Sequence, residues 1–576
     1  MLNSKPIEIT PLVLPFDHEP DLPGSKSIAN RALVLAALYE GLTDVVGAGE
    51  GDDVRSMVEN LRILGFDVQG RGGDYRVQGG IPKAPGTGKL DCGAGGTTLR
   101  YLLALAALCP GEWSIDGSER LRRRPIEELV TALGSLGARI EAKEGRLPLR
   151  VLGGGLHGGT IGIDASRSSQ FLSALLLIAP ALPQGLVIDV SGRLASASYV
   201  ALTLSTLEKF GVPVLRRGNR FDVGETKLES PGTYVVETDW SAAGAWLVIE
   251  RLTRSRLRLP RLDWRSAQPD SILPSILDAL EGDGPRTIEV SSCPDQLMNL
   301  AVFAARRVGP TRFTGAGTLN LKESERLVVL ERELGRAGVS VSHEVDELIV
   351  KGPAQLRPAT LEPESDHRMA MAFAIMGLMH PGIVVRDPGC VSKSYPGFFE
   401  ELAGLVDRPR AIALVGMRGA GKSTLAAELG KQLRLEVIDL DRVFESRCGP
   451  IGEFVRKEGW PRFREIEEAL VREHLAPRRV LALGGGAIES HGIRRALAAE
   501  AITVWVQEFA AILSQRVGAS SRPSVTSNDP VEEIGALMAR RDPLHRAAAD
   551  LVLPAGVGIE ERVEACRKGL NALCSW

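Results

Sequence analysis

One pattern recurs along the first half of the chain and limits the folds that are open to it. An amphipathic helix, with leucines three or four residues apart, is followed by a glycine and then by a short β-type run. A glycine there suits the left-handed conformation that ends many helices, and the alternation after it suits a strand with one buried face. The four copies span 57–68, 129–140, 202–214 and 327–341, with glycines at Gly65, Gly137, Gly211 and Gly338.

The spacing of these glycines predicts a repeated α/β architecture. The first three are separated by roughly 70 residues, and the gap before the fourth leaves room for one more unit. Weaker copies cover 272–290 and 368–379. Six α/β units over roughly 400 residues follow from this spacing. The alternative is that helix, glycine and strand follow one another by chance, since that order is common in α/β proteins.

Composition narrows the class of protein. A chain of 576 residues is too long for a single core, and a net charge of −3 gives no general attraction for nucleic acid or anionic membranes. The seven cysteines are scattered and lack C-x-x-C spacing, which fits a reducing compartment without disulfides or structural zinc. The N-terminus does not resemble a secretory signal, and prolines interrupt the apolar stretch at 171–188. We expect a cytoplasmic enzyme.

The repeat stops near residues 407–409, and a phosphate-binding motif follows. A short apolar strand at 411–415 leads into GMRGAGKS at 416–423, which fits G-x-x-x-x-G-K-[ST], and a helix at 424–433 comes next. In this motif glycines let backbone N–H groups face a phosphate. Lys422 is expected to bridge the β- and γ-phosphates, and the Ser423 hydroxyl to ligate magnesium. The C-terminal part is therefore predicted to bind a nucleotide on a parallel sheet.

Further polar groups follow the next strands. Asp439 and Asp441 come after the strand at 436–440, and Gly484 to Gly486 end another strand, in positions where open α/β sheets bind ligands. Arg464 and Arg541 lie in helical segments, and Arg522 lies in a serine-rich loop suited to a lid. Each of these also has an ordinary explanation, as a solvated arginine or a simple turn.

Taken together, residues 410–576 resemble shikimate kinase. The resemblance implies that Asp441 holds the hydroxyl to be phosphorylated and that Asp441, Arg464, Gly485 and Arg541 bind shikimate. It implies ATP and Mg²⁺ as the cofactors, with Ser423 and Asp439 at the metal. The residues it assigns to ATP are Gly419, Ala420, Gly421, Lys422, Ser423, Thr424 and Arg522. His545 stands where related sequences often have tyrosine.

The N-terminal part carries several clusters suited to oxyanions. They are LPGSKS at 22–27 with Arg31, GAGGT at 93–97, RLRRR at 120–124, SSQ at 168–170, KESER at 322–326, DHR at 366–368, and Lys393. Glycines, serines and helix starts offer N–H and hydroxyl donors, and the arginines and lysines offer charge. Any one cluster could be a solvated helix face or a simple cap. All of them together favour an anion-binding site.

These clusters resemble EPSP synthase (5-enolpyruvylshikimate-3-phosphate synthase) over residues 8–406. The closest matches are LPGSKSIANRAL, SSQFLSALLL, LKESERL, SDHRMAMAF and DPGCVSKSYPGFF. The resemblance implies two lobes, each of three βαβαββ units, with the active site between them. One lobe is expected to combine 1–20 with 238–406 and the other to span 21–237, followed by the kinase domain at 410–576.

The resemblance also implies roles for individual residues. Asp295 is expected to take the proton of the attacking 5-hydroxyl, Glu323 to handle the proton at the methylene carbon, and Lys26 to touch both ligands. No metal or organic cofactor is expected there. The residues implied for shikimate 3-phosphate are Lys26, Ser27, Arg31, Ser168, Ser169, Gln170, Ser196, Tyr199, Asp295 and Lys322. Those implied for phosphoenolpyruvate are Lys26, Gly96, Arg124, Gln170, Arg326, Arg368 and Lys393.

Two alternatives stay open at this point. The enolpyruvyl transferase acting on UDP-N-acetylglucosamine has a similar fold, but it works with a loop cysteine that the segment 118–124 lacks. The C-terminal part could also be a nucleotide-binding regulatory module, although Asp441, Arg464 and Arg541 then have no purpose. Ala94 stands where many relatives carry asparagine, and Thr318 where some carry a substrate-contacting asparagine. The predicted partners are small molecules (shikimate, ATP, shikimate 3-phosphate and phosphoenolpyruvate), without nucleic acid or membrane.

Overall fold

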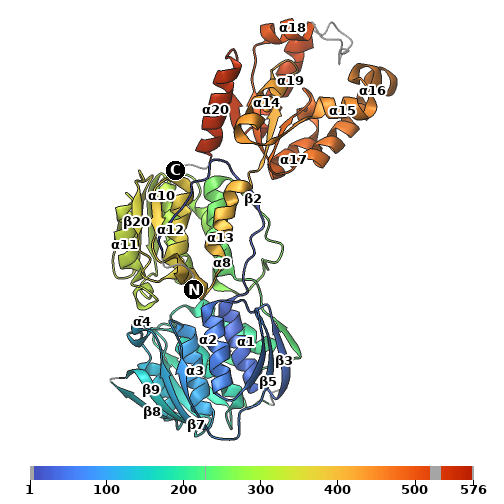
Figure 1. The fold of residues 1–576 in the computed structure, drawn as a ribbon. Coiled ribbons are helices and arrows are strands. Elements are labelled where there is room, and N and C mark those ends of the chain that lie inside the picture. The colour runs from blue at the N-terminus through green and yellow to red at the C-terminus, as the bar shows by residue number, and fades with distance from the viewer. Residues whose placement is uncertain (1–4, 144, 227–228, 519–532, 574–576) are drawn as a thin grey trace. The chain divides into compact units, whose positions relative to one another are not determined.

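The structure is a computed structural model that describes residues 5–143, 145–226, 229–518 and 533–573. It divides into two compact units. Unit 1 contains residues 1–9, 20–249 and 259–401, and unit 2 contains 10–19, 250–258 and 402–576. Both units mix helices with sheets (Figure 1), so the predicted α/β class is confirmed.

Four sheets of unit 1 share one topology among the described residues: a parallel pair of strands continued by two antiparallel neighbours. The first sheet contains β14 (Thr233–Val235), β3 (Gly41–Val46), β5 (Asp74–Gly79) and β4 (Asp67–Arg71). The second contains β6 (Gly86–Asp91), β7 (Gly111–Asp116), β9 (Arg146–Gly153) and β8 (Arg139–Lys143). The third contains β10 (Gly159–Asp164), β11 (Leu186–Ser191), β13 (Arg220–Val223) and β12 (Leu215–Arg217). The fourth contains β16 (Arg286–Glu289), β17 (Gly309–Thr314), β19 (Glu347–Gly352) and β18 (Ser340–His343).

The helices alternate with these strands in βαβαββ order. They are α1 (Lys26–Leu38), α2 (Asp52–Ile63), α3 (Gly96–Leu108), α4 (Glu119–Arg122), α5 (Glu127–Ser135), α6 (Ser169–Ile178), α7 (Ala197–Lys209), α10 (Leu297–Arg306) and α11 (Arg326–Arg336). The first sheet is completed by β14, which comes from a distant part of the chain and pairs in parallel with β3.

The glycines of the repeat end helices as predicted. Gly65, Gly137, Gly211 and Gly338 have φ angles of 97°, 98°, 76° and 96°. After each glycine, the next N–H bonds back to a carbonyl in the last helical turn, as Phe66 N does to Leu61 O at 3.0 Å. Residues other than glycine pay steric strain in this conformation, which explains why the repeat keeps a glycine at each helix end.

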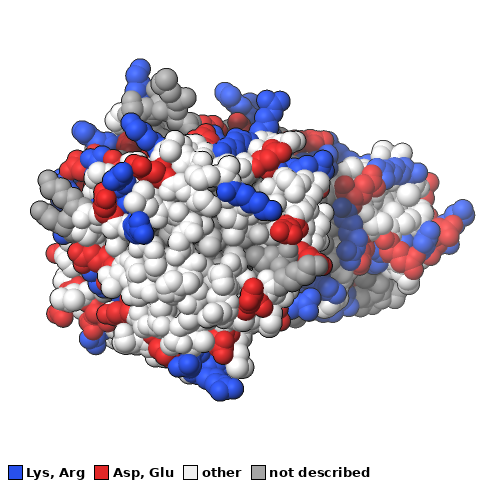
Figure 2. Space-filling model, turned by 90° about the horizontal axis from the view of Figure 1, so that it is seen from below, with Lys and Arg blue, Asp and Glu red and all other residues white. Residues whose placement is uncertain are grey.

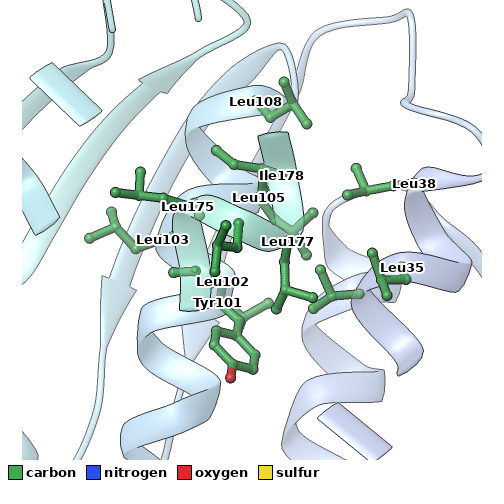
Figure 3. Close-up of a cluster of buried hydrophobic side chains, with 14 of the residues drawn as sticks. Leu35, Leu38, Tyr101, Leu102, Leu103, Leu105, Leu108, Leu175, Leu177 and Ile178 are labelled. Atoms are coloured by element: carbon green, nitrogen blue, oxygen red, sulfur yellow. The ribbon is translucent and has the colours of Figure 1, made fainter. Parts of the chain in front are cut away.

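Three helices form the centre of a large hydrophobic cluster. Leucines and other apolar side chains of α1, α3 and α6 pack on one another (Figure 3), and Leu35, Leu102, Leu105 and Leu177 have no exposed surface. Close packing of this kind gives the helix starts, which carry the polar motifs, a rigid foundation.

Unit 1 also contains a smaller sheet and further helices. A three-stranded sheet contains β1 (Ile7–Glu8), β21 (Ile383–Val385) and β20 (Ala359–Leu361), and the helices are α9 (Leu273–Leu280) and α12 (His367–Met379). Two further helices, α8 (Trp240–Thr253) and α13 (Phe398–Ala403), begin in unit 1 and end in unit 2. The segments at the two predicted lobe crossings bond to each other, with Ser25 N donating to Glu237 O at 2.8 Å and Asp239 N to Pro23 O at 2.9 Å. The division into lobes at these crossings stays a prediction.

Unit 2 contains the predicted parallel sheet, in the order β23-β24-β22-β25-β26. Its strands are β23 (Glu436–Asp439), β24 (Arg479–Ala482), β22 (Ala411–Val415), β25 (Ala501–Val506) and β26 (Leu551–Leu553). The helices are α14 (Lys422–Leu433), α15 (Leu440–Cys448), α16 (Ile451–His474), α17 (His491–Glu500), α18 (Ala510–Gly518), α19 (Glu533–Ala548) and α20 (Ile559–Ala572).

Two segments from the early part of the chain belong to unit 2. β2 (Asp17–His18) pairs in parallel with β15 (Arg256–Leu257), and Asp17 N donates to Arg408 O at 2.9 Å. Phe16 is fully buried, and Leu14 packs against the hydrophobic core beside the sheet. The unit that carries the phosphate loop therefore includes residues that the sequence analysis assigned to the transferase part.

The described residues can be compared with the features of membrane-spanning and nucleic-acid-binding proteins. No helix among them combines the length and the apolar character needed to cross a bilayer. On the face drawn in Figure 2, lysines and arginines are interspersed with acidic side chains, and a broad area carries few charges. That face does not present the continuous basic surface that follows a nucleic-acid backbone.

Candidate active sites

Polar side chains from distant segments of unit 1 converge on one pocket. They come from the starts of α1, α3, α6 and α7, from the loop before α10 and from the segment before α11. The predicted residues that line it are Lys26, Ser27, Arg31, Gly96, Arg124, Ser168, Ser169, Gln170, Ser196, Tyr199, Asp295, Lys322 and Glu323.

Helix starts position several of these groups. The Ser168 Oγ caps α6 by accepting from Gln170 N at 3.2 Å, and Gln170 Nε2 donates to Thr97 Oγ1 at 3.1 Å. Gly96 opens α3, and a Cβ there would lie 2.5 Å from the guanidinium of Arg124. A larger residue at this position would displace the guanidinium of Arg124, which packs directly on the backbone.

Glu323 is surrounded by cations. Its carboxylate lies 3.0 Å from Lys393 Nζ, 3.2 Å from Arg326 Nη2 and 3.5 Å from Arg124 Nη1. Burial by itself raises the pKa of this carboxyl, but Lys393, Arg124 and Arg326 outweigh burial and hold the pKa well below its usual range. Glu323 is therefore ionised at neutral pH in this arrangement.

Asp295 has a similar environment. Its carboxylate lies 2.8 Å from Arg326 Nη1, 3.6 Å from Arg368 Nη2 and 3.7 Å from Lys322 Nζ, and it accepts a hydrogen bond of 3.2 Å from the Tyr199 hydroxyl. Burial again raises the pKa, and the three cations, Lys322 first, lower it well below its usual value. An ionised carboxylate in a pocket wall can accept a proton from a ligand hydroxyl.

Three predicted phosphoenolpyruvate residues lie behind the pocket wall rather than in it. Arg326, Arg368 and Lys393 do not line the pocket and are 1%, 3% and 6% exposed. They contact the pocket-lining carboxylates as described above. Arg326 also bonds to Asp366 at 2.8 Å, and Asp366 caps α12. In this structure these cations therefore contact the pocket indirectly, by their ion pairs with Asp295 and Glu323.

The sequence analysis missed three charged residues of this pocket, Asp53, Arg100 and Arg167. Asp53 accepts from Lys26 Nζ at 3.1 Å, and Arg100 donates to Gly96 O at 3.1 Å. Arg100 lies one helical turn after Gly96, so the glycine-rich helix start was a usable signal. Asp53 lies in the first turn of α2, where acidic residues are common for helix stability alone, so its sequence position carried no signal.

Ala94 and Thr318, the two departures from the family pattern, have different environments. Lys393 Nζ donates to the backbone carbonyl of Ala94 at 2.8 Å, a contact that does not use the side chain at that position. Thr318 lines the pocket beside Leu321 and Lys322.

The phosphate loop of unit 2 joins β22 to α14. Gly416, Gly419 and Gly421 have φ angles of 144°, 82° and 91°, which explains the glycines of the motif. Lys422 Nζ donates to the carbonyls of Gly416 and Met417 at 2.9 and 3.0 Å. Of the predicted nucleotide and metal residues, a pocket at the loop is lined by Gly419, Gly421, Lys422, Ser423, Thr424 and Asp439, whereas Ala420 is buried.

A second pocket of unit 2 contains the predicted shikimate residues. Asp441, Arg464, Gly485 and Arg541 line it, and Asp441 and Gly485 also line the loop pocket. Arg541 Nη1 donates to Gly485 O at 3.2 Å. Two adjoining pockets that share a carboxylate suit the transfer of a group from one bound molecule to another.

The triple glycine permits close approach of side chains. A Cβ at Gly484 would lie 2.2 Å from Glu467 Oε1, one at Gly485 2.7 Å from Arg418 N, and one at Gly486 2.0 Å from Arg464 Nη2. These glycines therefore do more than form a turn, because larger residues would displace the groups that line the second pocket.

Glu467 is a further residue that the sequence analysis missed. It is buried, pairs with Arg464 and lies beside Asp441 at the Gly484 backbone. Burial raises the pKa of its carboxyl. Its position three residues after Arg464 on α16 could have revealed the pair.

His545 and Arg522 are the remaining positions that the sequence analysis singled out in the C-terminal part. His545 is buried and stacks on Trp505, with ring centroids 5.6 Å apart, and burial lowers its pKa to about 4, with contributions from Lys422 and Arg541. Arg522 lies outside the described residues, so its expected position at ATP is not tested.

Comparison with known proteins identifies both parts of the chain. The family model of EPSP synthase (3-phosphoshikimate 1-carboxyvinyltransferase) matches residues 17–402, and that of shikimate kinase matches residues 418–568. A 3-phosphoshikimate 1-carboxyvinyltransferase of Nostoc punctiforme is 34% identical over 70% of this chain and 99% of its own length. One of Citrobacter koseri is 35% identical over 66% of this chain and 95% of its own length.

Solved structures support the fold of the larger part. An EPSP synthase from Acinetobacter baumannii superposes with a TM-score of 0.57 at 23% identity, covering 69% of this chain and 97% of that one. The enolpyruvyl transferase NikO from Streptomyces tendae has a TM-score of 0.55 at 17% identity, with the same coverage. At these identities the similarity concerns the fold alone.

Proposed function

Since the chain belongs to the EPSP synthase family and carries a shikimate kinase domain over residues 418–568, we propose that its two parts catalyse consecutive reactions of the shikimate pathway. The C-terminal domain phosphorylates shikimate with ATP. The N-terminal part transfers the enolpyruvyl group of phosphoenolpyruvate to the 5-hydroxyl of shikimate 3-phosphate and releases phosphate.

One observation carries the transferase assignment: two ionised carboxylates and many cations surround a single pocket. Both expected ligands are anionic, and their charges match Lys26, Arg124 and Lys322 in the pocket wall. We assign shikimate 3-phosphate and phosphoenolpyruvate to the two sets of residues given above for them, with Lys26 and Gln170 in contact with both.

Asp295 and Glu323 divide the proton transfers of the reaction. The 5-hydroxyl oxygen bonds to C2 of phosphoenolpyruvate while its proton passes to Asp295, and a proton from Glu323 converts the methylene carbon to a methyl group. Phosphate then leaves C2, Glu323 takes a proton back from the methyl group to restore the double bond, and the proton on Asp295 leaves with the phosphate. Glu323 is ionised beside Lys393, which lies 3.0 Å away, so it must take up a proton before it can donate one.

In the kinase domain, Asp441 orients and polarises the shikimate hydroxyl while Arg464 and Arg541 hold its carboxylate. Both arginines line the same pocket as Asp441, and a planar guanidinium suits a carboxylate. Lys422 and the N–H groups of residues 419–424 hold the phosphates. Phosphoryl transfer depends mainly on such positioning and on neutralisation of charge.

The residues present fit a magnesium ion that is bound together with the nucleotide. Ser423 and Asp439 line the loop pocket, and Asp439 uses Oδ1 to cap α15, with Oδ2 3.9 Å from Arg442. Mg²⁺ commonly binds through one or two protein oxygen ligands together with substrate phosphates and waters. Magnesium supplies positive charge to the phosphates.

A coupled assay tests the whole proposal. Shikimate, ATP and phosphoenolpyruvate are supplied together with magnesium, and formation of the enolpyruvyl product is measured. Product formation supports both activities; kinase turnover alone, or turnover only with UDP-N-acetylglucosamine, contradicts the transferase assignment. Asp441→Asn should abolish shikimate-dependent ATP consumption while ATP binding persists, which excludes a purely regulatory C-terminal domain. The cytoplasmic location and the lack of nucleic-acid and membrane partners stay predictions.

A further inference from the structure

Two arginines hold the phosphate loop by its backbone carbonyls. Arg562 of α20 donates from Nη1 to Ala420 O at 2.7 Å, and Arg516 of α18 donates from Nη1 to Gly419 O at 2.9 Å. In a planar trans peptide, the C=O of one residue and the N–H of the next point in opposite directions. Fixing the Ala420 carbonyl on one side of the loop therefore fixes the Gly421 N–H toward the other side.

Glu508 connects both arginines to the sheet. It follows β25, and its Oε2 accepts from Arg562 Nη2 at 2.9 Å and from Arg516 Nη1 at 3.3 Å. Its Oε1 accepts from the backbone N–H groups of Phe509 and Gly556, both at 3.1 Å. Burial raises the pKa of this carboxyl, but these backbone and Arg562 hydrogen bonds outweigh burial and lower it. Glu508 is an ionised anchor between β25, the segment after β26 and the two arginines.

The geometry at Arg562 requires a guanidinium. Besides the bonds to Ala420 and Glu508, its Nη2 donates to Gln507 O at 3.0 Å, and its side chain is only 5% exposed. Five donors in a fixed plane can reach three acceptors at once, which the single ammonium of lysine cannot do in the same positions. Both Arg562 and Arg516 also line the loop pocket, together with Lys422 and Ser423.

We propose that Arg562 and Glu508 are positioning residues of the nucleotide site, which hold the 419–421 segment in the conformation that presents its N–H groups to phosphate. The inference rests on the proposed kinase activity. It adds two residues outside the phosphate-loop motif, on elements that follow that loop by roughly 90 and 140 positions in the printed sequence. Without them the loop has more conformations to lose when nucleotide binds, so affinity falls.

Three variants of the full chain test the proposal: Arg562→Leu, Arg562→Lys and Glu508→Gln. The dissociation constant of ADP with magnesium is measured by calorimetry, and KM for ATP, KM for shikimate and kcat are measured by turnover. We expect Arg562→Leu to weaken ADP binding and raise KM for ATP about tenfold, the scale of a lost charged hydrogen bond. KM for shikimate and transferase turnover should not change, and Arg562→Lys should recover part of the loss.

Arg567→Leu is the matched control. Arg567 lies on the same helix, is about half exposed and pairs only with Glu564 among the interactions described, at 3.4 Å. The control should bind ADP like the parent chain.

A purely structural role for Arg562 predicts a different result, namely lower thermal stability of unit 2 with unchanged ADP affinity, and that result overturns the proposal. If Arg562→Leu does not fold, Glu508→Gln decides: severalfold weaker ADP binding supports the proposal, and parental affinity refutes it. ADP binding needs no shikimate, so a chain that binds ADP without phosphorylating shikimate refutes the proposed kinase reaction and leaves the positioning role to be judged on affinity alone.

Discussion

The two active sites of this chain bind anions in different ways. In unit 1, cationic side chains from distant segments gather around Asp295 and Glu323, each of which contacts three of them within 3.7 Å. In unit 2, eight consecutive residues form a loop whose glycines aim backbone groups at one pocket. The first site depends on a balance of opposite charges, and the second on backbone conformation.

This difference determines how each site should respond to substitution. In unit 1 the carboxylates that we propose as reacting groups are also the counterions of buried cations, so removing one disturbs several neighbours. In unit 2 most donors belong to the backbone, so a side-chain change removes one contact at a time. The following predictions test this contrast.

The largest effect is expected for Asp295→Asn. Loss of the proton acceptor should lower kcat of the transferase on the order of 10²–10⁴-fold. Kinase turnover in the same preparation should not change. Steady-state assays of both reactions check the result, with Asp441→Asn as the reciprocal variant. A transferase rate within a few fold of the parent would show that Asp295 is not the base.

The second largest effect is expected on the stability of unit 1, when Arg326 is removed from its buried carboxylate partners. Arg326→Met leaves Asp295, Glu323 and Asp366 without a shared buried partner, and we expect a loss of about 3–5 kcal/mol in the unfolding free energy of unit 1. Arg312→Met removes an exposed pair with Glu347 and should cost less than about 1 kcal/mol. Denaturant unfolding measures both. Equal losses in the two variants would contradict the charge-balance interpretation.

The pH dependence of stability should differ between the units. Burial lowers the pKa of His545 from 6.5 to about 4, so the folded state favours the neutral ring. The stability from this residue is complete above pH 6.5 and is lost as pH falls toward 4, by up to about 3 kcal/mol. Asp295 and Glu323, with lowered pKa values, keep their contribution to lower pH.

Unfolding of unit 2 at pH 7 and pH 4.5 checks this expectation. His545→Phe keeps a ring beside Trp505 and removes the titration, so its stability should change less between the two pH values. His491→Gln, at an exposed histidine of the same unit, should behave like the parent chain. If His545→Phe keeps the full pH dependence, another group is responsible.

The smallest effect is expected for Ala94→Asn. Lys393 bonds to the carbonyl of residue 94, and this contact survives the substitution. KM for phosphoenolpyruvate should change less than about fivefold, the scale of one neutral hydrogen bond. A larger change would show that the side chain at this position contacts a ligand directly.

Much of the site could be predicted from local sequence patterns. The phosphate loop, the capped start of α6 and the helix-ending glycines each depend on residues within a few positions of one another. Their physical requirements, such as positive φ at Gly419 or a cap at Ser168, are visible in the residues themselves. Arg100 could also have been predicted, because it lies one helical turn after Gly96 on the same helix.

Other features could not be read in this way because they depend on contacts between distant segments. Asp53 reaches Lys26, and Glu508 reaches Arg562, only after the chain has folded. A lone acidic residue on a helix or after a strand has many ordinary roles, so its sequence context does not reveal its partner.

By itself, the sequence determined the α/β class, the repeat, the two families and the phosphate loop, because periodicity, glycine conformation and contiguous motifs are local properties of the chain. Only the tertiary structure decided which charges are neighbours: it put Arg326, Arg368 and Lys393 behind the pocket wall, and it made residues 10–19 and 250–258 part of unit 2. The physical reason is that Coulomb energy depends on distance in space, and distance along the chain does not specify it.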